Sequence, residues 1–238
     1  MHALDPDPLL PIPPPGQDEL PYDDGEPMES AKHRDQMTLL IETLQRHLAD
    51  RPGVYIGGNM AVYFSALQAR NNDFRAPDYF VVLDAIPDRE RKSWVVWEED
   101  GRTPDVVIEL LSASTEAEDR GRKKRVYASL KVREYYLYDP LTEWIEGYRL
   151  EGSVLVPLQR RPDGDYDCVT LGLRLGVAEG VYHSHTGRYL RWKTADGALL
   201  ATGDELEAVA RARADTAEAR AERLAARLRA LGVDPEGA

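Results

Sequence analysis

The sequence predicts a mixed α/β domain in which a helix, several strands, a second helix and a further strand follow one another. Three observations predict it: apolar residues at helical spacing near residue 40, short β-rich runs divided by glycine and proline, and a second helical stretch that leads into a strand. The chain has 238 residues, of which 42% are hydrophobic and 30% charged, and this suits one sizeable domain with appendages.

The first 30 residues predict an extended, acidic arm. Prolines recur through this segment, and eight acidic residues precede the first lysine, Lys32. Such a composition favours solvated chain over a packed core, because it offers little apolar surface to bury. The globular domain is therefore expected to span residues 31–202.

The first helix of the domain is predicted from apolar residues at helical spacing, namely Met37, Leu40, Ile41, Leu44 and Leu48. Arg51-Pro52-Gly53 ends it. Short β-rich runs follow at 54–56, 60–64, 79–83, 93–97 and 105–111.

A second helix is predicted over about 116–130, and it leads into a strand at 134–139. Further strand-like runs lie at 144–150, 153–158 and 188–193, with glycine-containing breaks between them. They predict an antiparallel extension of the sheet.

The last region, residues 203–238, predicts an amphipathic helix and a short tail. Its small and apolar residues alternate in steps of four and three, which defines a heptad seam: Ala210, Ala214, Ala217, Ala221, Leu224, Leu228 and Leu231. Two interpretations stay open, a helix packed on its own domain and an oligomerisation coil. The alanines bury little area, so a dimer held by this seam alone would be weak.

Composition narrows the classes of function. The chain has no run of eighteen apolar residues and no basic-then-apolar start, so a cytoplasmic protein without a membrane partner is predicted. Its one cysteine, Cys168, excludes an internal disulfide. The net charge of −12 argues against indiscriminate binding of phosphate backbones.

Two carboxylates indicate a metal site. Asp78 stands at the mouth of the run 79–83, and Glu109 lies within the apolar run 105–111, where an unpaired charge is costly. Neighbouring strands place two such groups about 5 Å apart at the backbone, close enough to share one Mg²⁺ or Mn²⁺. Asp105 lies roughly 13 Å from Glu109 along the same strand, so Asp78 is the predicted partner.

The densest basic cluster follows at the second helix, and it comprises Arg120, Arg122, Lys123, Lys124 and Arg125. A cation here could stabilise the charge that develops on an attacked phosphodiester. The alternative is a solvated helix face on which Asp119 pairs with Lys123 at i,i+4. Spacing alone does not decide between the two.

The motifs of this stretch, taken together, resemble those of the Uma2 family of restriction endonucleases in the PD-(D/E)XK superfamily. The residues that carry the resemblance are Pro77-Asp78, the run 104–112, the run 119–123, Tyr127 and the run 134–140. It extends from about residue 33 to the C-terminal helix and leaves out the arm. The resemblance implies a restriction-endonuclease-like αβββαβ core with antiparallel strand additions and a C-terminal helix.

The resemblance also implies a metal-dependent endonuclease that acts on nucleic acid, with DNA as the expected substrate. Asp78 and Glu109 would hold Mg²⁺ or Mn²⁺ together with the main-chain carbonyl of Leu110. The superfamily lysine is missing, because its position is Leu111. Lys123, rather than Lys124, is expected to take its role.

The resemblance and the heptad seam together predict a homodimer. A second function stays open, a catalytically silent module that binds nucleic acid or protein on the same fold. The acidic net charge favours this alternative, whereas the retention of both carboxylates and the lysine favours the enzyme.

Overall fold

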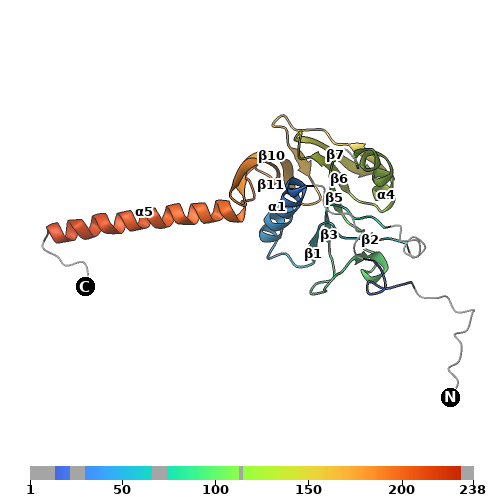
Figure 1. Cartoon of the computed structure of the whole chain (residues 1–238), viewed down its shortest axis with the longest axis horizontal. Helices are drawn as coiled ribbons and strands as arrows, with labels where there is room; N and C mark the ends of the chain where they lie inside the picture. Colours follow the sequence, from blue (N-terminus) through green and yellow to red (C-terminus); the bar gives the residue numbers. More distant parts are fainter. Residues whose placement is uncertain (1–13, 22–29, 66–73, 113–114, 232–238) are drawn as a thin grey trace, which may run out of the picture.

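The computed structural model describes residues 14–21, 30–65, 74–112 and 115–231. It has a mixed α/β body built on a six-stranded sheet, from which one long C-terminal helix projects (Figure 1). This agrees with the mixed α/β class predicted from the sequence. The predicted division of the chain at residues 30 and 202 stays a prediction.

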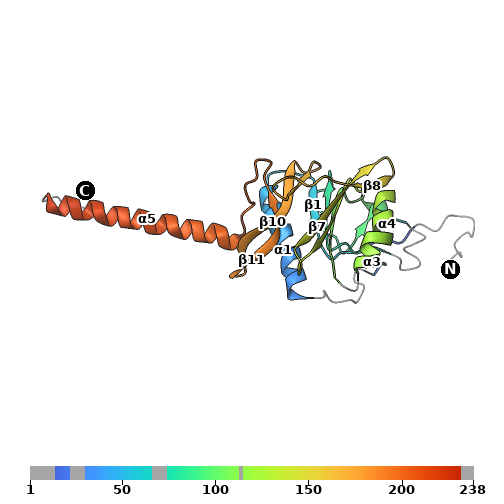
Figure 2. The ribbon, with the colours of Figure 1, turned by 90° about the horizontal axis from the view of Figure 1, so that it is seen from above.

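The first helix, α1 (Ala31–His47), begins where the apolar periodicity indicates. The Ser30 side chain caps it by accepting a hydrogen bond from the His33 main-chain N–H. Leu39, Leu40 and Leu44 are fully buried, which fixes the face of α1 that packs on the body. Figure 2 shows α1 lying between the main sheet and the strands that precede the C-terminal helix.

The main sheet has the strand order β1-β3-β5-β6-β7-β8. These strands are β1 (Val54–Gly57), β3 (Tyr79–Leu83), β5 (Val106–Leu110), β6 (Glu134–Asp139), β7 (Trp144–Glu151) and β8 (Val154–Pro157). Only β5 and β6 are parallel neighbours in this sheet, and the crossover between them is helical. The helical crossover therefore starts at the end of β5, beside the predicted site.

The crossover is not the single α-helix that the sequence predicted. It consists of α3 (Glu116–Glu118), a π-helical turn η2 (Asp119–Lys123) and α4 (Lys124–Ser129). A π turn widens the helix locally and recurs at functional sites. Here it carries most of the predicted basic cluster.

Three of the predicted strands lie outside the main sheet. The runs 60–64 and 93–97 form a separate parallel pair, β2 (Val62–Tyr63) and β4 (Trp94–Val95), and the short helix η1 (Val96–Glu98) follows. The run 188–193 belongs to β11 (His185–Lys193), which pairs with β10 (Leu173–Tyr182), and β10 pairs with β9 (Tyr166–Cys168). The extension predicted from sequence is thus correct for β7 and β8 but wrong for β11, which lies in a second sheet.

The two faces of the main sheet pack against different partners. Side chains on one face, including those of Tyr79, Ile108 and Tyr136, share a core with α1 and with Trp192 of β11. Side chains on the other face, including those of Phe80, Val107, Tyr135 and Leu137, share a core with Tyr127 and Ala128 of α4. Since side chains alternate along a strand, Asp78 and Glu109 belong to the face covered by the crossover.

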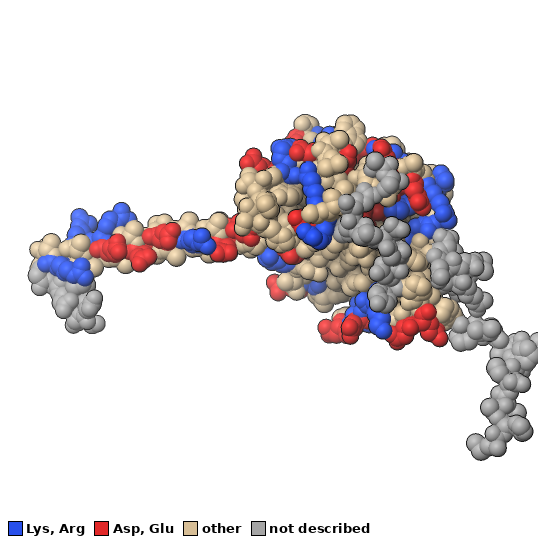
Figure 3. Space-filling model, in the orientation of Figure 1, with Lys and Arg blue, Asp and Glu red and all other residues tan. Residues whose placement is uncertain are grey.

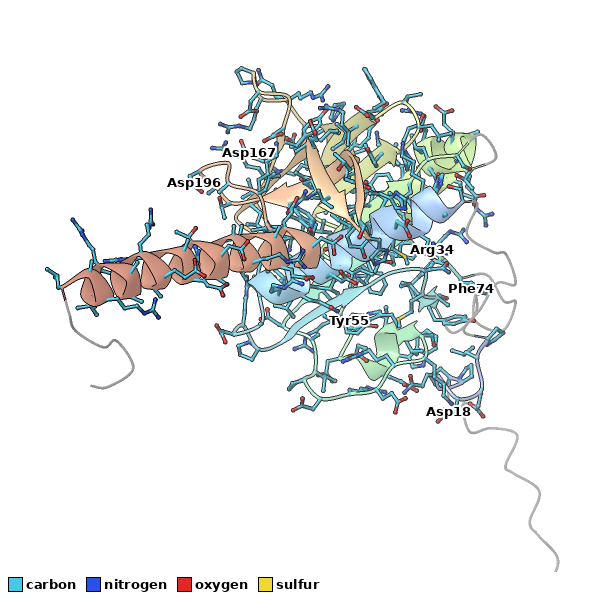
Figure 4. All side chains as sticks on the ribbon, turned by 60° about the vertical axis from the view of Figure 1, so that its left-hand side comes forward. Asp18, Arg34, Tyr55, Phe74, Asp167 and Asp196 are labelled. Carbon is cyan, nitrogen blue, oxygen red and sulfur yellow. The ribbon has the colours of Figure 1, made fainter. Side chains whose placement is uncertain are left out.

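The proline-rich arm is not wholly solvated chain. Leu20 is 7% exposed and packs in a cluster with Tyr63 and Val95, and the Trp97 indole N–H donates to the Pro15 carbonyl. Asp18, labelled in Figure 4, forms an ion pair with Lys92. Residues 14–21 therefore pack on the body, which proline and acid content alone did not indicate.

The last helix, α5 (Gly203–Ala230), leaves the body after its first turn (Figures 1 and 2). Thr202 and Glu205 form a capping box, in which each side chain accepts a main-chain N–H of the other residue. None of the helices in the described part of the chain combines the length and the apolar character that a membrane crossing needs.

Gly58 lies close to the main chain of Asp78, the residue before β3, and this close approach generates a stability prediction. A Cβ at Gly58 would lie 2.7 Å from the Asp78 carbonyl oxygen and 2.8 Å from the Met37 sulfur. We expect Gly58→Ala to destabilise the fold by about 1–3 kcal/mol, because backbone and side chain must both move. Denaturant unfolding measures this.

The matched control is Gly121→Ala, at a helical glycine whose added Cβ meets nothing within 4 Å. It should leave the free energy of unfolding unchanged or raise it by up to about 1 kcal/mol. Equal losses in the two variants would contradict the close approach at Gly58.

Candidate active site

Strand register brings Asp78 and Glu109 together. Tyr79 pairs with Ile108 in the antiparallel ladder of β3 and β5, so Asp78 comes opposite Glu109 one step further along. The Asp78 N–H donates to Glu109 Oε2 over 3.3 Å, and the Leu110 N–H donates to Asp78 Oδ2 over 2.7 Å. The two carboxylates thus lie side by side, as the sequence predicted.

Glu109 is fully buried, whereas Asp78 keeps part of its surface exposed. The hydroxyl of Tyr127 donates to Glu109 Oε1 over 2.7 Å, and Tyr127 is itself fully buried. A buried carboxylate needs such donors, because it has lost its hydration. One end of the pair is therefore enclosed by protein and the other opens towards solvent.

Lys123 reaches both buried acids of the crossover face. Its ammonium lies 3.2 Å from Glu109 Oε1 and 2.8 Å from Asp119 Oδ1. The i,i+4 pair of the alternative interpretation is therefore present, but Asp119 is only 1% exposed and Lys123 17%. The face is not a solvated one, so the alternative is wrong about the surroundings of Lys123.

The π turn η2 holds Asp119 and Lys123 against the end of β5. The Tyr135 hydroxyl, from the neighbouring strand β6, donates to the Asp119 carbonyl over 3.0 Å. On the outer side, Arg120 forms ion pairs with Glu116 and with Glu146 of β7. The contacts of Asp119 with Tyr135 and of Arg120 with Glu146 tie the crossover to the sheet on either side of Lys123.

Lys123 and Lys124 point to different places, as expected for adjacent helical residues. The Lys124 ammonium lies 3.4 Å from the centre of the Tyr148 ring on β7. Burial lowers the pKa of Lys124. Asp105 lies at the opposite end of β5, where it accepts the Leu83 N–H and pairs with Arg133. The contacts of Lys124 and Asp105 are therefore with other residues than Glu109, whereas Lys123 and Asp78 contact Glu109 directly.

The charges of the cluster shift one another's pKa values. Burial raises the pKa of Glu109 to about 7; the Lys123 ammonium opposes this rise, and the Asp78 carboxylate adds to it. Burial and Glu109 raise the pKa of Asp119 to about 6. Burial would lower the pKa of Lys123, but the carboxylates of Glu109 and Asp119 outweigh it and raise that pKa.

The donor set suits a hard divalent cation, because carboxylate oxygens are the side-chain ligands that Mg²⁺ and Mn²⁺ prefer. Asp78 and Glu109 are the two carboxylates that would offer oxygens to such an ion. Within the described ranges, no group of three His, Cys, Asp or Glu side chains is placed to hold an ion by itself. Main-chain oxygen, for which Leu110 stays the prediction, and water would have to complete the coordination.

Sequence reasoning gave Tyr127 no role and treated Asp119 as a surface residue. The spacing contained a signal, since Asp119, Lys123 and Tyr127 recur every four residues and so share one helical face. That face is the one turned towards Glu109. Burial, which the periodicity does not report, is what makes these residues part of the site.

The fold and the site define a mixed α/β domain in which an acidic pair on two neighbouring central strands meets a lysine of the helical crossover. Residues 9–178 match the model of the Uma2 family, which is described as "Putative restriction endonuclease". The chain belongs to the Uma2 family. The match includes part of the proline-rich arm, which the motifs left out, and ends within β10, before α5.

A solved structure is also similar, that of a protein from Anabaena variabilis described as "a putative nuclease belonging to DUF820". The two chains are 17% identical, with a TM-score of 0.46, and the similarity covers 63% of this chain and 81% of the other. No curated protein matches this chain. The family assignment rests on the family match alone.

The raised pKa of Glu109 generates a prediction for the metal-free chain. The folded state binds this proton more tightly than the unfolded state, so stability falls as pH rises from about 4.5 to about 7. We expect Glu109→Gln to stabilise the fold in EDTA at pH 8 by on the order of 3 kcal/mol, with no gain at pH 4. Thermal unfolding across pH measures it.

Glu151→Gln, at an exposed glutamate that ends β7, is the control. It should leave the pH dependence of unfolding unchanged. A Glu109→Gln variant that is less stable than the parent chain at pH 8 would contradict the raised pKa.

Proposed function

We propose that this chain is a metal-dependent endonuclease that hydrolyses phosphodiester bonds, with DNA as its substrate. The observation that carries the proposal is the convergence of Asp78, Glu109 and Lys123 at one edge of the main sheet. The order of the elements, helix, three antiparallel strands, helical crossover and parallel strand, is that of a restriction-endonuclease-like αβββαβ core and supports it. Family membership points the same way.

In this proposal the residues of the chain divide the work. Asp78 and Glu109 hold Mg²⁺ or Mn²⁺, and the Leu110 carbonyl is the expected third protein ligand. Tyr127 holds Glu109 in place through its 2.7 Å hydrogen bond. Lys123, which is rigidly paired to two carboxylates, presents its ammonium to the charge that develops on the attacked phosphate.

The divalent ion would lower the pKa of a bound water, and so supply the nucleophile at neutral pH. The ionisation of Glu109 fits this assignment. Its carboxylate is enclosed and its pKa lies near 7, so an additional cation would favour the charged form. Asp78 is partly exposed, so in this proposal water and substrate reach the pair from its side.

A second function is favoured by one observation, the enclosure of Glu109. Its Oε1 already contacts the Tyr127 hydroxyl and the Lys123 ammonium. A site closed in this way would fold and bind a partner without an ion and without turnover. The alternative is therefore a catalytically silent module that binds nucleic acid or protein on the same fold.

Metal binding separates the two functions. We expect calorimetric titration with Mn²⁺ to show one ion per chain, and Asp78→Asn to abolish it, because a neutral amide leaves the ion with one carboxylate. Supercoiled plasmid should be nicked in Mn²⁺ and left intact in EDTA. Asp105→Asn, at the far end of β5, is the control and should bind the ion normally.

The lysine assignment generates a separate prediction. Lys123→Ala should lower turnover by roughly two to three orders of magnitude, because it removes the charge nearest the reacting phosphate. Lys124→Ala should mainly weaken substrate binding, with a shallower salt dependence. Nicking rates at several salt concentrations, with circular dichroism as a check of folding, distinguish the two. Equal effects of the two substitutions would show that the assignment of Lys123 is wrong.

A further inference from the structure

Within the part of the chain that the structure describes, α5 has no partner along most of its length. Its contacts with the body lie in the first turn, where the fully buried Arg191 forms an ion pair with Glu205 over 2.8 Å and the Ser184 N–H donates to Asp204. None of the 28 residues of the helix is buried. Since most helical stability in proteins comes from packing an apolar face, an uncovered helix of this length indicates a missing partner.

The uncovered residues include large apolar side chains at heptad positions. Leu224 is 52% exposed and Leu228 37%, and Leu231, which caps the C-terminus of α5, is 77% exposed; together with the alanines they continue the seam in steps of four and three. In heptad letters, Ala214, Ala221 and Leu228 occupy position a, and Ala210, Ala217, Leu224 and Leu231 occupy position d. Figure 3 shows charged side chains beside uncharged ones along this helix.

We propose that the occupant of this face is a second copy of the chain, and that the two α5 helices form a parallel coiled coil. The flanking charges select both the partner and the direction. Position g holds Arg213, Arg220 and Arg227, and the position e that follows Arg213 holds Glu218. In a parallel pair, Arg213 faces Glu218 of the partner subunit, twice by symmetry.

An antiparallel pair is disfavoured by the same residues. If the helices ran in opposite directions and were centred on the seam, each g position would face a g position of the partner. Arg213 would then face Arg227 of the partner subunit, and Arg220 would face its own copy. Like charges at these positions oppose association, so the sequence of α5 encodes the direction of pairing.

The parallel direction determines where the two bodies lie. Both copies of Gly203 are at the same end of the coil, so the two bodies lie next to each other. An antiparallel coil would separate them by the length of α5, about 42 Å at 1.5 Å per residue. Two candidate sites on one side of the coil are suited to the two strands of one duplex; this consequence, unlike the dimer itself, rests on the proposed function.

The mass of the full chain, measured by sedimentation across a concentration series, tests the dimer. We expect a concentration-dependent dimer, which Leu224→Glu combined with Leu228→Glu should weaken by roughly 100-fold or more, because four leucines leave the interface. Val209→Glu, at an exposed apolar residue off the seam, is the control and should dimerise normally. A monomer at every concentration, or a dimer unaffected by the double substitution, would overturn the proposal.

Charge reversal tests the direction, because the two arrangements predict opposite signs. In the parallel coil Arg213→Glu places Glu opposite Glu218 of the partner subunit and weakens the dimer, and adding Glu218→Arg restores it. In an antiparallel coil Arg213→Glu would relieve the repulsion with Arg227 of the partner subunit and tighten the dimer. A tighter dimer in the single variant would overturn the parallel arrangement. Both readouts are masses, so they are independent of any nuclease activity.

Discussion

The burial of one carboxylate, that of Glu109, is the constraint on which the site depends. It lies fully enclosed on a strand whose other residues are apolar, where an uncompensated charge would cost several kcal/mol. Asp78, Asp119 and Lys123 surround it, and the one ammonium of this group pairs with two of its three carboxylates, those of Glu109 and Asp119. Fully ionised, this group would carry a net charge of −2, which a divalent cation would balance.

The same constraint explains why the crossover has its shape. Lys123 must reach the inner end of β5 while Arg120, three residues earlier, pairs with Glu146 on the outside. Arg120 and Lys123 both belong to the π turn, and their guanidinium and ammonium groups point to different sides of the crossover. The tyrosines of α4 and β6 supply hydroxyl donors where apolar residues would leave oxygens unpaired. Local geometry here serves the electrostatics of one buried group.

The carboxylate pair was predictable because it follows from strand parity and neighbouring strands, which are local and periodic. The choice of Lys123 over Lys124 came from the resemblance to the family, because helix geometry says only that two adjacent side chains diverge by about 100°. The burial of Asp119 and Tyr127 was not, since it depends on how the crossover packs against the sheet. β9 and β10 were missed because their strands are short or interrupted by glycine, and β11 was placed in the wrong sheet because pairing partners are not encoded in periodicity.

The acidic net charge bears less on nucleic-acid binding than its size indicates. Eight of the 42 acidic residues lie in the first 30 residues, which contain no lysine or arginine, so the rest of the chain carries −4 of the total −12. Ionic screening at physiological salt reduces the reach of exposed charges to about 8 Å. The electrostatic potential that a phosphate backbone would experience at the site is therefore set by the charged groups within that distance. Along the crossover that carries Lys123, Arg125 is exposed and Arg120 and Lys124 are partly exposed.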